Sequence, residues 1–318
     1  MIDLDSGALD ISMKVVGVGG GGGSVLWRLA EDRLQSIELI AVDTAEKNLE
    51  ALGKGGIQTI QIGNRITNGR GTGGKAEIGE KAAEAAQDTI GPAFEGANIV
   101  FIASCFGGGA GTGATPVVAR IAKSMGLLSV AVVTMPFRFE GTRKRKMAEI
   151  ALDKMRGEVD ALIVIHNDNL LRLSEKKLGM AEAFHLADDV LRQGIRLVTD
   201  MVFTTGEINL DFADLAMALR ESPSSDAVLG IGESENGSAE EAVRRAVESP
   251  LLDRKLAGAS HAILNIVGDE KLGMCAVEEA AEYVRQEAGD EINIIFGSVF
   301  NPAMAGRVQA MLVATGFE

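Results

Sequence analysis

The chain has 318 residues, enough for two packed domains, and 46% hydrophobic with 24% charged residues is the composition of a globular protein. Its 31 basic and 45 acidic residues give a net charge of −14, which would repel a polyphosphate backbone, so we expect no nucleic-acid partner. The chain shows no His or Cys metal-ligand spacing, signal peptide or apolar run of about 18 residues, so we expect a soluble cytoplasmic protein without a direct membrane segment.

Apolar, β-branched runs alternate with helical patterns along the first half of the chain. The runs lie at residues 13–18, 37–42, 98–103, 127–134 and 161–165. This alternation predicts a parallel sheet that is wrapped by helices. Apolar residues then recur at helical spacing over residues 180–201 without an internal proline, which predicts one long, partly buried helix.

A second set of strand and helix patterns follows that helix. Strand-like runs at 228–232, 261–268, 292–300 and 307–317 are separated by helix-like segments at 238–249 and 277–288. The last two runs have no helix between them, so we expect this smaller sheet to be mixed. The sequence thus predicts an α/β protein with a Rossmann-like nucleotide domain at 1–178, a connecting helix at 179–202 and a C-terminal domain at 203–318.

The first of three glycine segments, residues 19–23, lies between a predicted strand and a helix, where backbone amides and the helix dipole favour an anion. Residues 17–22 also match the pattern G-x-G-x-x-G, and Asp43 lies 21 residues after Gly22 at the end of the next strand. That spacing is the dinucleotide-binding fingerprint. This region alone would therefore favour an NAD-dependent oxidoreductase.

The second glycine segment, residues 69–76, nearly matches the P-loop pattern, but Ala76 has no hydroxyl for magnesium, and a glycine-rich surface loop is the alternative. The third glycine segment, residues 107–113, precedes a helix that we expect to begin near Thr115 and Pro116. Three such segments exceed the needs of one pyrophosphate, but they could surround a triphosphate.

The third glycine segment, G-G-G-A-G-T-G, resembles the tubulin/FtsZ signature G-G-G-T-G-T/S-G. The FtsZ pattern continues in family order through VVTMPFRFEG at 132–141, IVIHND at 163–168, ADDVLRQG at 187–194 and EINLDFADL at 207–215. The chain thus resembles a divergent prokaryotic FtsZ-like protein. The resemblance implies binding of GTP and GDP with Mg²⁺, a head-to-tail homopolymer that hydrolyses GTP, and other FtsZ-like or division proteins as further partners.

The resemblance also implies which residues bind the nucleotide. Glu140 would lie near the ribose, and Lys144, flanked by two arginines, lies where the family has a cation. Asn167, Phe184 and Asp188 would hold guanine, since a carboxylate accepts from its N–H and amino groups while a ring stacks. From the residues alone, Phe184 could equally be a core aromatic and Asp188 a solvated carboxylate. The residues expected around the phosphates are Gly20, Gly21, Gly22, Gly23, Ser24, Gly71, Thr72, Gly73, Gly109, Ala110, Gly111, Thr112 and Gly113.

Asn209, Asp211 and Asp214 match the family's catalytic loop, which implies that they act on the nucleotide of a neighbouring subunit. Hydrolysis would then require assembly. Without the family, Asp211 would be interpreted as a helix cap. Ala110 and Ala45 replace family residues with hydroxyl and carboxyl groups, so slow turnover is expected, and a nucleotide-binding filament subunit with little hydrolysis is the alternative.

Overall fold

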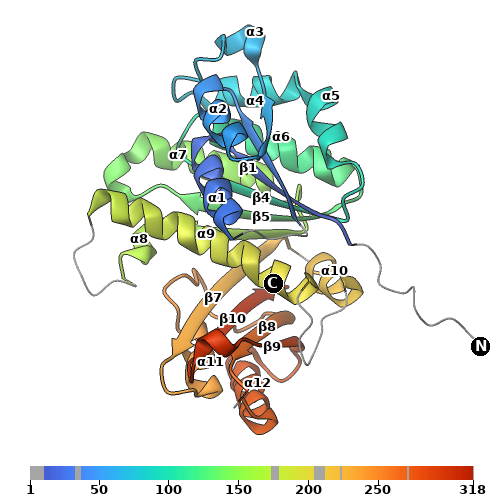
Figure 1. Cartoon of the computed structure of the whole chain (residues 1–318), viewed down its shortest axis with the longest axis vertical. Helices are drawn as coiled ribbons and strands as arrows, with labels where there is room; N and C mark the ends of the chain where they lie inside the picture. The colour runs from blue at the N-terminus through green and yellow to red at the C-terminus, as the bar shows by residue number, and fades with distance from the viewer. Residues whose placement is uncertain are drawn as a thin grey trace, which may run out of the picture.

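The computed structural model describes residues 11–32, 37–172, 179–203, 212–222, 224–270 and 272–317. Within these ranges, ten strands form one sheet in the order β3-β2-β1-β4-β5-β6-β7-β10-β8-β9 (Figure 1). The strands are β1 Met13–Val18, β2 Ile37–Asp43, β3 Gln58–Gln61, β4 Ile99–Cys105, β5 Leu128–Met135, β6 Ala161–His166, β7 Asp226–Ser234, β8 His261–Gly268, β9 Asn293–Phe300 and β10 Val308–Thr315.

Strands β1 to β6 are parallel, and β1, β4 and β5 are buried almost throughout, as continuous apolar runs between two helical layers should be. Successive side chains point to opposite faces, so Val15 packs into one core and Val16 into the other. The first core includes α1, Gly19–Glu31, and α9, Met180–Phe203; the second includes α4, Ala76–Glu84, α6, Ala110–Ser124, and α7, Thr142–Met155.

The long helix predicted at 180–201 is α9, and it runs between the two halves of the molecule (Figure 1). Its buried residues Leu191 and Ile195 belong to a core that also holds Leu229 of β7 and Val313 of β10. One apolar core therefore joins the nucleotide-domain sheet to the C-terminal strands.

The C-terminal strands form a mixed arrangement, as the sequence predicts: β10 is antiparallel to β7 and β8, and β8 is parallel to β9. They do not form a separate sheet, because β7 pairs with β6 through Leu162 with Asp226 and Ile163 with Ala227. The short strand β3 was not predicted, since its sequence QTIQ carries no apolar run. The domain boundaries at residues 178 and 202 stay a prediction.

The remaining helices are short or lie in the C-terminal half. None of the helices that the structure describes is both long and apolar enough to span a membrane. These helices are α2 Glu46–Lys54, α3 Asn64–Thr67, α5 Gln87–Ile90, α8 Asn167–Leu170, α10 Phe212–Arg220, α11 Ala239–Val247 and α12 Met274–Ala288, with single 3₁₀ turns at Gly91–Phe94, Arg138–Glu140 and Pro302–Met304.

Candidate functional site

The glycine segments meet where the strand order reverses, because β1 pairs with β2 on one side and with β4 on the other. Ligands of open α/β sheets bind at this switch point, outside the carboxyl ends of the strands. Here the first segment opens α1 after β1, and the third leads from β4 into α6. Gly19 has φ +74°, and a Cβ atom on it would lie 2.6 Å from the amide nitrogen of Gly111, so the two segments touch.

Helix α6 begins at Ala110, earlier than predicted, and Pro116 lies inside it rather than in its first turn. The amide of Gly113 already donates to the carbonyl of Gly109 at 3.1 Å, and the Thr115 hydroxyl donates to the carbonyl of Gly111 at 2.5 Å. The end of the glycine segment is thus the first turn of the helix. The backbone amides that precede this first helical bond have no partner within the helix, so they remain as anion donors at its positive end.

The second glycine segment packs directly against the third. A Cβ atom on Gly109 would overlap the buried Thr72 hydroxyl and lie 2.8 Å from the amide nitrogen of Lys75. The segment follows the short helix α3 instead of a strand, so it is not a P-loop. It is also more than a free surface loop, because Thr72, flanked by Gly71 and Gly73, packs against the third glycine segment.

Asp43, the acidic residue of the dinucleotide fingerprint, is buried and used within its own turn. Its carboxylate accepts from the amides of Thr44 at 2.6 Å and Ala45 at 3.2 Å, and from the side-chain amide of Asn48 at 2.9 Å. These bonds hold the turn before α2 and use both carboxylate oxygens. Asp43 is therefore committed to its own turn with three of its about four acceptor positions, which argues against the oxidoreductase interpretation.

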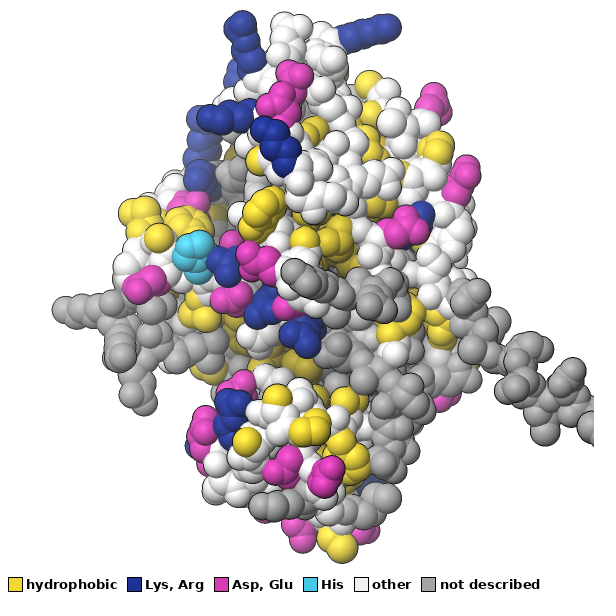
Figure 2. All heavy atoms as spheres, in the orientation of Figure 1, with side chains coloured by type: hydrophobic (Ala, Val, Ile, Leu, Met, Phe, Trp, Pro, Cys, Tyr) yellow, Lys and Arg dark blue, Asp and Glu magenta, His cyan; other side chains and the backbone are white. Residues whose placement is uncertain are grey.

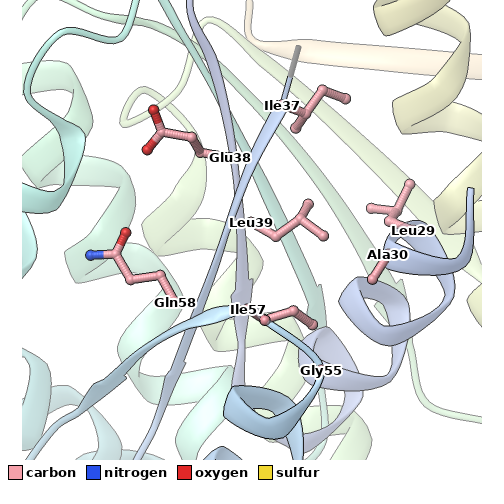
Figure 3. Close-up of a pocket in the computed structure, with 9 residues that line it drawn as sticks. Leu29, Ala30, Ile37, Glu38, Leu39, Gly55, Ile57 and Gln58 are labelled. Atoms are coloured by element: carbon pink, nitrogen blue, oxygen red, sulfur yellow. The ribbon is translucent and has the colours of Figure 1, made fainter. Parts of the chain in front are cut away.

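The sequence did not point to Lys47 and Asn48, which line a cavity of about 360 Å³ between α1 and α2 together with Gly20 and Ser24. They belong to the first turn of an ordinary amphipathic helix, so no motif indicates them. Another cavity of about 360 Å³ lies at the opposite ends of the strands, where Leu39 and Ile57 face Leu29 of α1 (Figure 3). It is remote from the glycine segments.

Lys144 is the cation that the fold places beside the third glycine segment. Its Cβ atom would lie 3.3 Å from a Cβ atom on Gly107, and its ammonium group donates to Glu140 at 2.8 Å. Glu140 in turn accepts from the amide of Phe137 at 3.0 Å. Arg145, in contrast, pairs with Glu149 one turn further along α7 at 3.2 Å.

The three predicted guanine residues come from two elements. Asn167 begins α8 directly after β6, and its side-chain oxygen is buried without a hydrogen-bond partner. Phe184 of α9 is 39% exposed, with its ring edge-on to Phe137 at 5.4 Å, so it is not an ordinary core aromatic. Asp188 lies one helical turn after Phe184, and its side chain is 13% exposed, so it is not a freely solvated carboxylate.

The pKa values of Asp188 and Cys105 reflect the burial of this region. Burial raises the pKa of Asp188 to about 6, against the opposing charges of Arg28 and His185. Burial also raises the pKa of Cys105 to about 12, with further contributions from the carboxylates of Asp188 and Glu140. A Cβ atom on Gly21 would overlap Cys105, so this residue of β4 packs directly against the first glycine segment.

Of the predicted catalytic residues, Asn209 and Asp211 lie outside the described residues. Asp214 is the third residue of α10 and is exposed.

Among the residues that the structure describes, no group of three or more His, Cys, Asp or Glu side chains could hold a metal ion. On the face shown in Figure 2, Lys and Arg side chains stand among Asp and Glu side chains.

Comparison with known proteins identifies the family. A model described as the Tubulin/FtsZ family, GTPase domain, matches residues 12–175, and one described as the FtsZ family, C-terminal domain, matches residues 225–318. The structure of an empty FtsZ dimer from M. jannaschii is 34% identical, with a TM-score of 0.89, over 96% of this chain and 88% of that chain. The structure of CetZ2 from Haloferax volcanii, a GTPgS-bound protofilament, is 23% identical, with a TM-score of 0.80, over 97% of this chain and 94% of that chain.

The fold and the site thus define a protein with a guanine-nucleotide GTPase domain and an FtsZ-type C-terminal domain. The chain belongs to the tubulin/FtsZ family. The resemblance found in the glycine signature is confirmed over nearly the whole chain.

Proposed function

We propose that this protein binds GTP and GDP at the switch point of the sheet. The observation that carries the proposal is a set of side chains near the glycine segments with the chemistry to bind guanine. Asn167 presents a buried amide oxygen without a partner, Phe184 presents a partly exposed ring, and Asp188 presents a partly buried carboxylate. A guanine base supplies an aromatic face and two N–H donors, which this set of groups fits.

The proposal includes Mg²⁺ as a companion of the nucleotide. Mg²⁺ keeps several waters and is bound largely through substrate phosphates, so it does not require a dedicated cluster of protein ligands. The absence of such a cluster among the described residues is compatible with that mode of binding. Bound in this way, the ion would neutralise negative charge on the phosphates.

We further propose that the subunits assemble head to tail and hydrolyse GTP at their contact. The support is the family assignment, together with the M. jannaschii relative, whose structure is that of an FtsZ dimer. A head-to-tail contact joins two different surfaces and does not close, so it extends into a filament. Asn209, Asp211 and Asp214 of one subunit would orient the attacking water at the nucleotide of the next.

Calorimetry with GTP, GDP, ATP and NAD tests the nucleotide assignment. The guanine nucleotides should bind at least tenfold more tightly than the other two, and equal affinity for ATP or a preference for NAD would contradict the proposal. Negative-stain microscopy and sedimentation with GTP, with GDP and without nucleotide test assembly. Filaments should form with GTP.

The Asp211→Ala variant tests catalysis across the contact. It should keep the affinity of the free subunit for GTP and lose most phosphate release, and wild-type specific activity should rise with protein concentration. Glu221→Ala is the matched control, since this exposed carboxylate lies just beyond the other end of α10. Activity that is independent of protein concentration would remove the shared site.

A filament subunit with little hydrolysis is the second candidate. It is favoured by Ala110 at the first position of α6, where a residue with a hydroxyl could reach the terminal phosphate. Phosphate release at a fixed polymer mass separates the two candidates. A role in cell division is one use of such a filament, and a cytoskeletal role in cell shape is another.

A further inference from the structure

Arg28 of α1 is bound to the acidic face of α9 at the predicted guanine site. Its Nε atom lies 3.5 Å from the Oδ2 atom of Asp188, and its Nη1 atom lies 3.3 Å from the Oδ1 atom of Asp189. Its Nη2 atom contacts the Nδ1 atom of His185. One guanidinium group thus connects the helix that opens with the phosphate segment to the carboxylate expected to recognise the base.

Both side chains of the ion pair between Arg28 and Asp188 are largely shielded from solvent. The side chain of Arg28 is 24% exposed and that of Asp188 is 13% exposed. A second arginine, Arg192 of α9, joins its helix to the end of α1 through Asp32, the C-cap residue of α1, at 2.9 Å, and it also pairs with Asp189 of its own helix at 3.6 Å. The contact between α1 and α9 therefore has an anchor that does not involve Asp188.

We propose that Arg28 is a positioning residue for base recognition, which holds Asp188 ionised and oriented so that its carboxylate accepts from both N–H groups on the guanine edge. This inference rests on the proposed binding of guanine nucleotide. A carboxylate has about four acceptor positions, so an arginine on one side leaves positions open for the base on the other. Arg28 acts through Asp188 and needs no contact with the nucleotide.

The physical reason is that burial works against the ionised carboxylate. Burial raises the pKa of Asp188 to about 6, while Arg28 and His185 lower it and Asp189 raises it. The Asp188 carboxylate also contributes to the raised pKa of the Cys105 thiol on β4. Without Arg28, burial and Asp189 would favour the protonated carboxyl, which cannot accept from both N–H groups of guanine.

The test is the affinity for GTP as a function of pH in the wild type, Arg28→Gln and Arg28→Lys. Wild-type affinity should fall with acidity and be about tenfold below its plateau at pH 5, since the carboxyl pKa is about 6. In Arg28→Gln the pH of half-maximal affinity should rise by about one unit or more, the effect of losing an adjacent opposite charge. Arg28→Lys keeps the charge and should restore most of the wild-type profile.

Two controls separate this role from simple docking of the helices. Arg192→Gln breaks the ion pair between α9 and Asp32 at the end of α1, where Arg192 does not contact Asp188, so it should leave the pH of half-maximal affinity unchanged. Imidazoles protonate in the same pH range. The change that Arg28→Gln causes in the pH of half-maximal affinity is therefore measured again in a His185→Gln background, where it should persist.

Inosine triphosphate provides a readout specific to the base, because hypoxanthine lacks the 2-amino group. The wild-type preference for GTP over inosine triphosphate at pH 7 should fall in Arg28→Gln. Tighter GTP binding by Arg28→Gln would mean that Arg28 blocks Asp188, and an unchanged pH profile would mean that it plays no part; either result overturns the inference. Failure of the wild type to bind GTP at any pH would instead overturn the proposed function.

Discussion

Gly109 and Thr72 lie in direct contact, so the second and third glycine segments can close together only because Gly109 has no side chain. Gly109→Ala should therefore force the segments apart and lower the free energy of unfolding by about 1–3 kcal/mol, the usual cost of overpacking. Thermal unfolding without nucleotide measures it. Gly108→Ala is the matched control, because a Cβ atom there would meet nothing within 4 Å, and an equal loss in both variants would contradict the explanation.

Lys144 should be the basic residue of α7 that supports nucleotide binding. The Cβ atom of Lys144 lies next to Gly107, and its ammonium group donates a hydrogen bond to Glu140. Arg145 instead pairs with Glu149. Lys144→Gln should weaken GTP binding about three- to tenfold, the loss of roughly 1 kcal/mol from a partly exposed charge. Calorimetry on Lys144→Gln and Arg145→Gln compares them, and a larger loss for Arg145→Gln would show that the wrong cation has been chosen.

Asp188→Asn should exchange the preferred base. The carboxylate accepts from both N–H groups of guanine, whereas an amide can donate to the carbonyl that xanthine carries in place of the amino group. The variant should bind xanthosine triphosphate more tightly than GTP, by competition against a fluorescent nucleotide. Asp189→Asn, one residue along the same helix, should keep the preference for guanine. If Asp188→Asn weakens the binding of GTP and of xanthosine triphosphate equally, Asp188 does not recognise the edge of the base.

The stability of the nucleotide-free protein should depend on pH through the same carboxyl group. Burial raises the pKa of Asp188 from 3.8 to about 6, so the folded state holds this proton more tightly than the unfolded state. The contribution to stability is complete below about pH 4 and is lost as the pH rises through about 6. Asp188→Asn should therefore stabilise the protein at pH 7 by about 1–2 kcal/mol, a value reduced for solvent screening and for the lost pair with Arg28.

Denaturant unfolding across this pH range checks the sign. The gain from Asp188→Asn should shrink as the pH falls and disappear well below pH 4, where the carboxyl group is protonated in both states. A gain that is constant with pH would mean that packing, and not charge, is responsible.

Ala110→Thr should raise the rate of GTP hydrolysis more than the affinity for GTP. The added hydroxyl would stand at the first position of α6 and would donate where charge builds on the transferred phosphoryl group. One hydrogen bond to a charged group is worth about 1.5–3 kcal/mol, which corresponds to roughly a ten- to hundredfold rate gain at most. Ala110→Val has the same shape without the hydroxyl, so phosphate release at matched polymer mass should rise only in the threonine variant.

Local sequence determined the long helix and the strands of the nucleotide domain other than the short β3. Residues 161–165 are a continuous apolar run, and residues 13–18 depart from one only at Lys14, because a parallel strand covered on both faces tolerates few polar side chains. Residues 180–201 keep apolar side chains on one helical face. The glycine signature, together with the motifs that follow it, was also enough to identify the family.

Tertiary structure decided which groups are free to act. The sequence offers Asp43 as a ligand, but the turn before α2 uses both of its oxygens. It places Pro116 at a helix start, but glycines packed against the second segment let α6 begin at Ala110. Arg28 and Asp188 belong to distant segments, so no local sequence pattern predicts that they form an ion pair at 3.5 Å. Such contacts depend on how the elements pack, because the free energy that sets them comes from groups far apart in the chain.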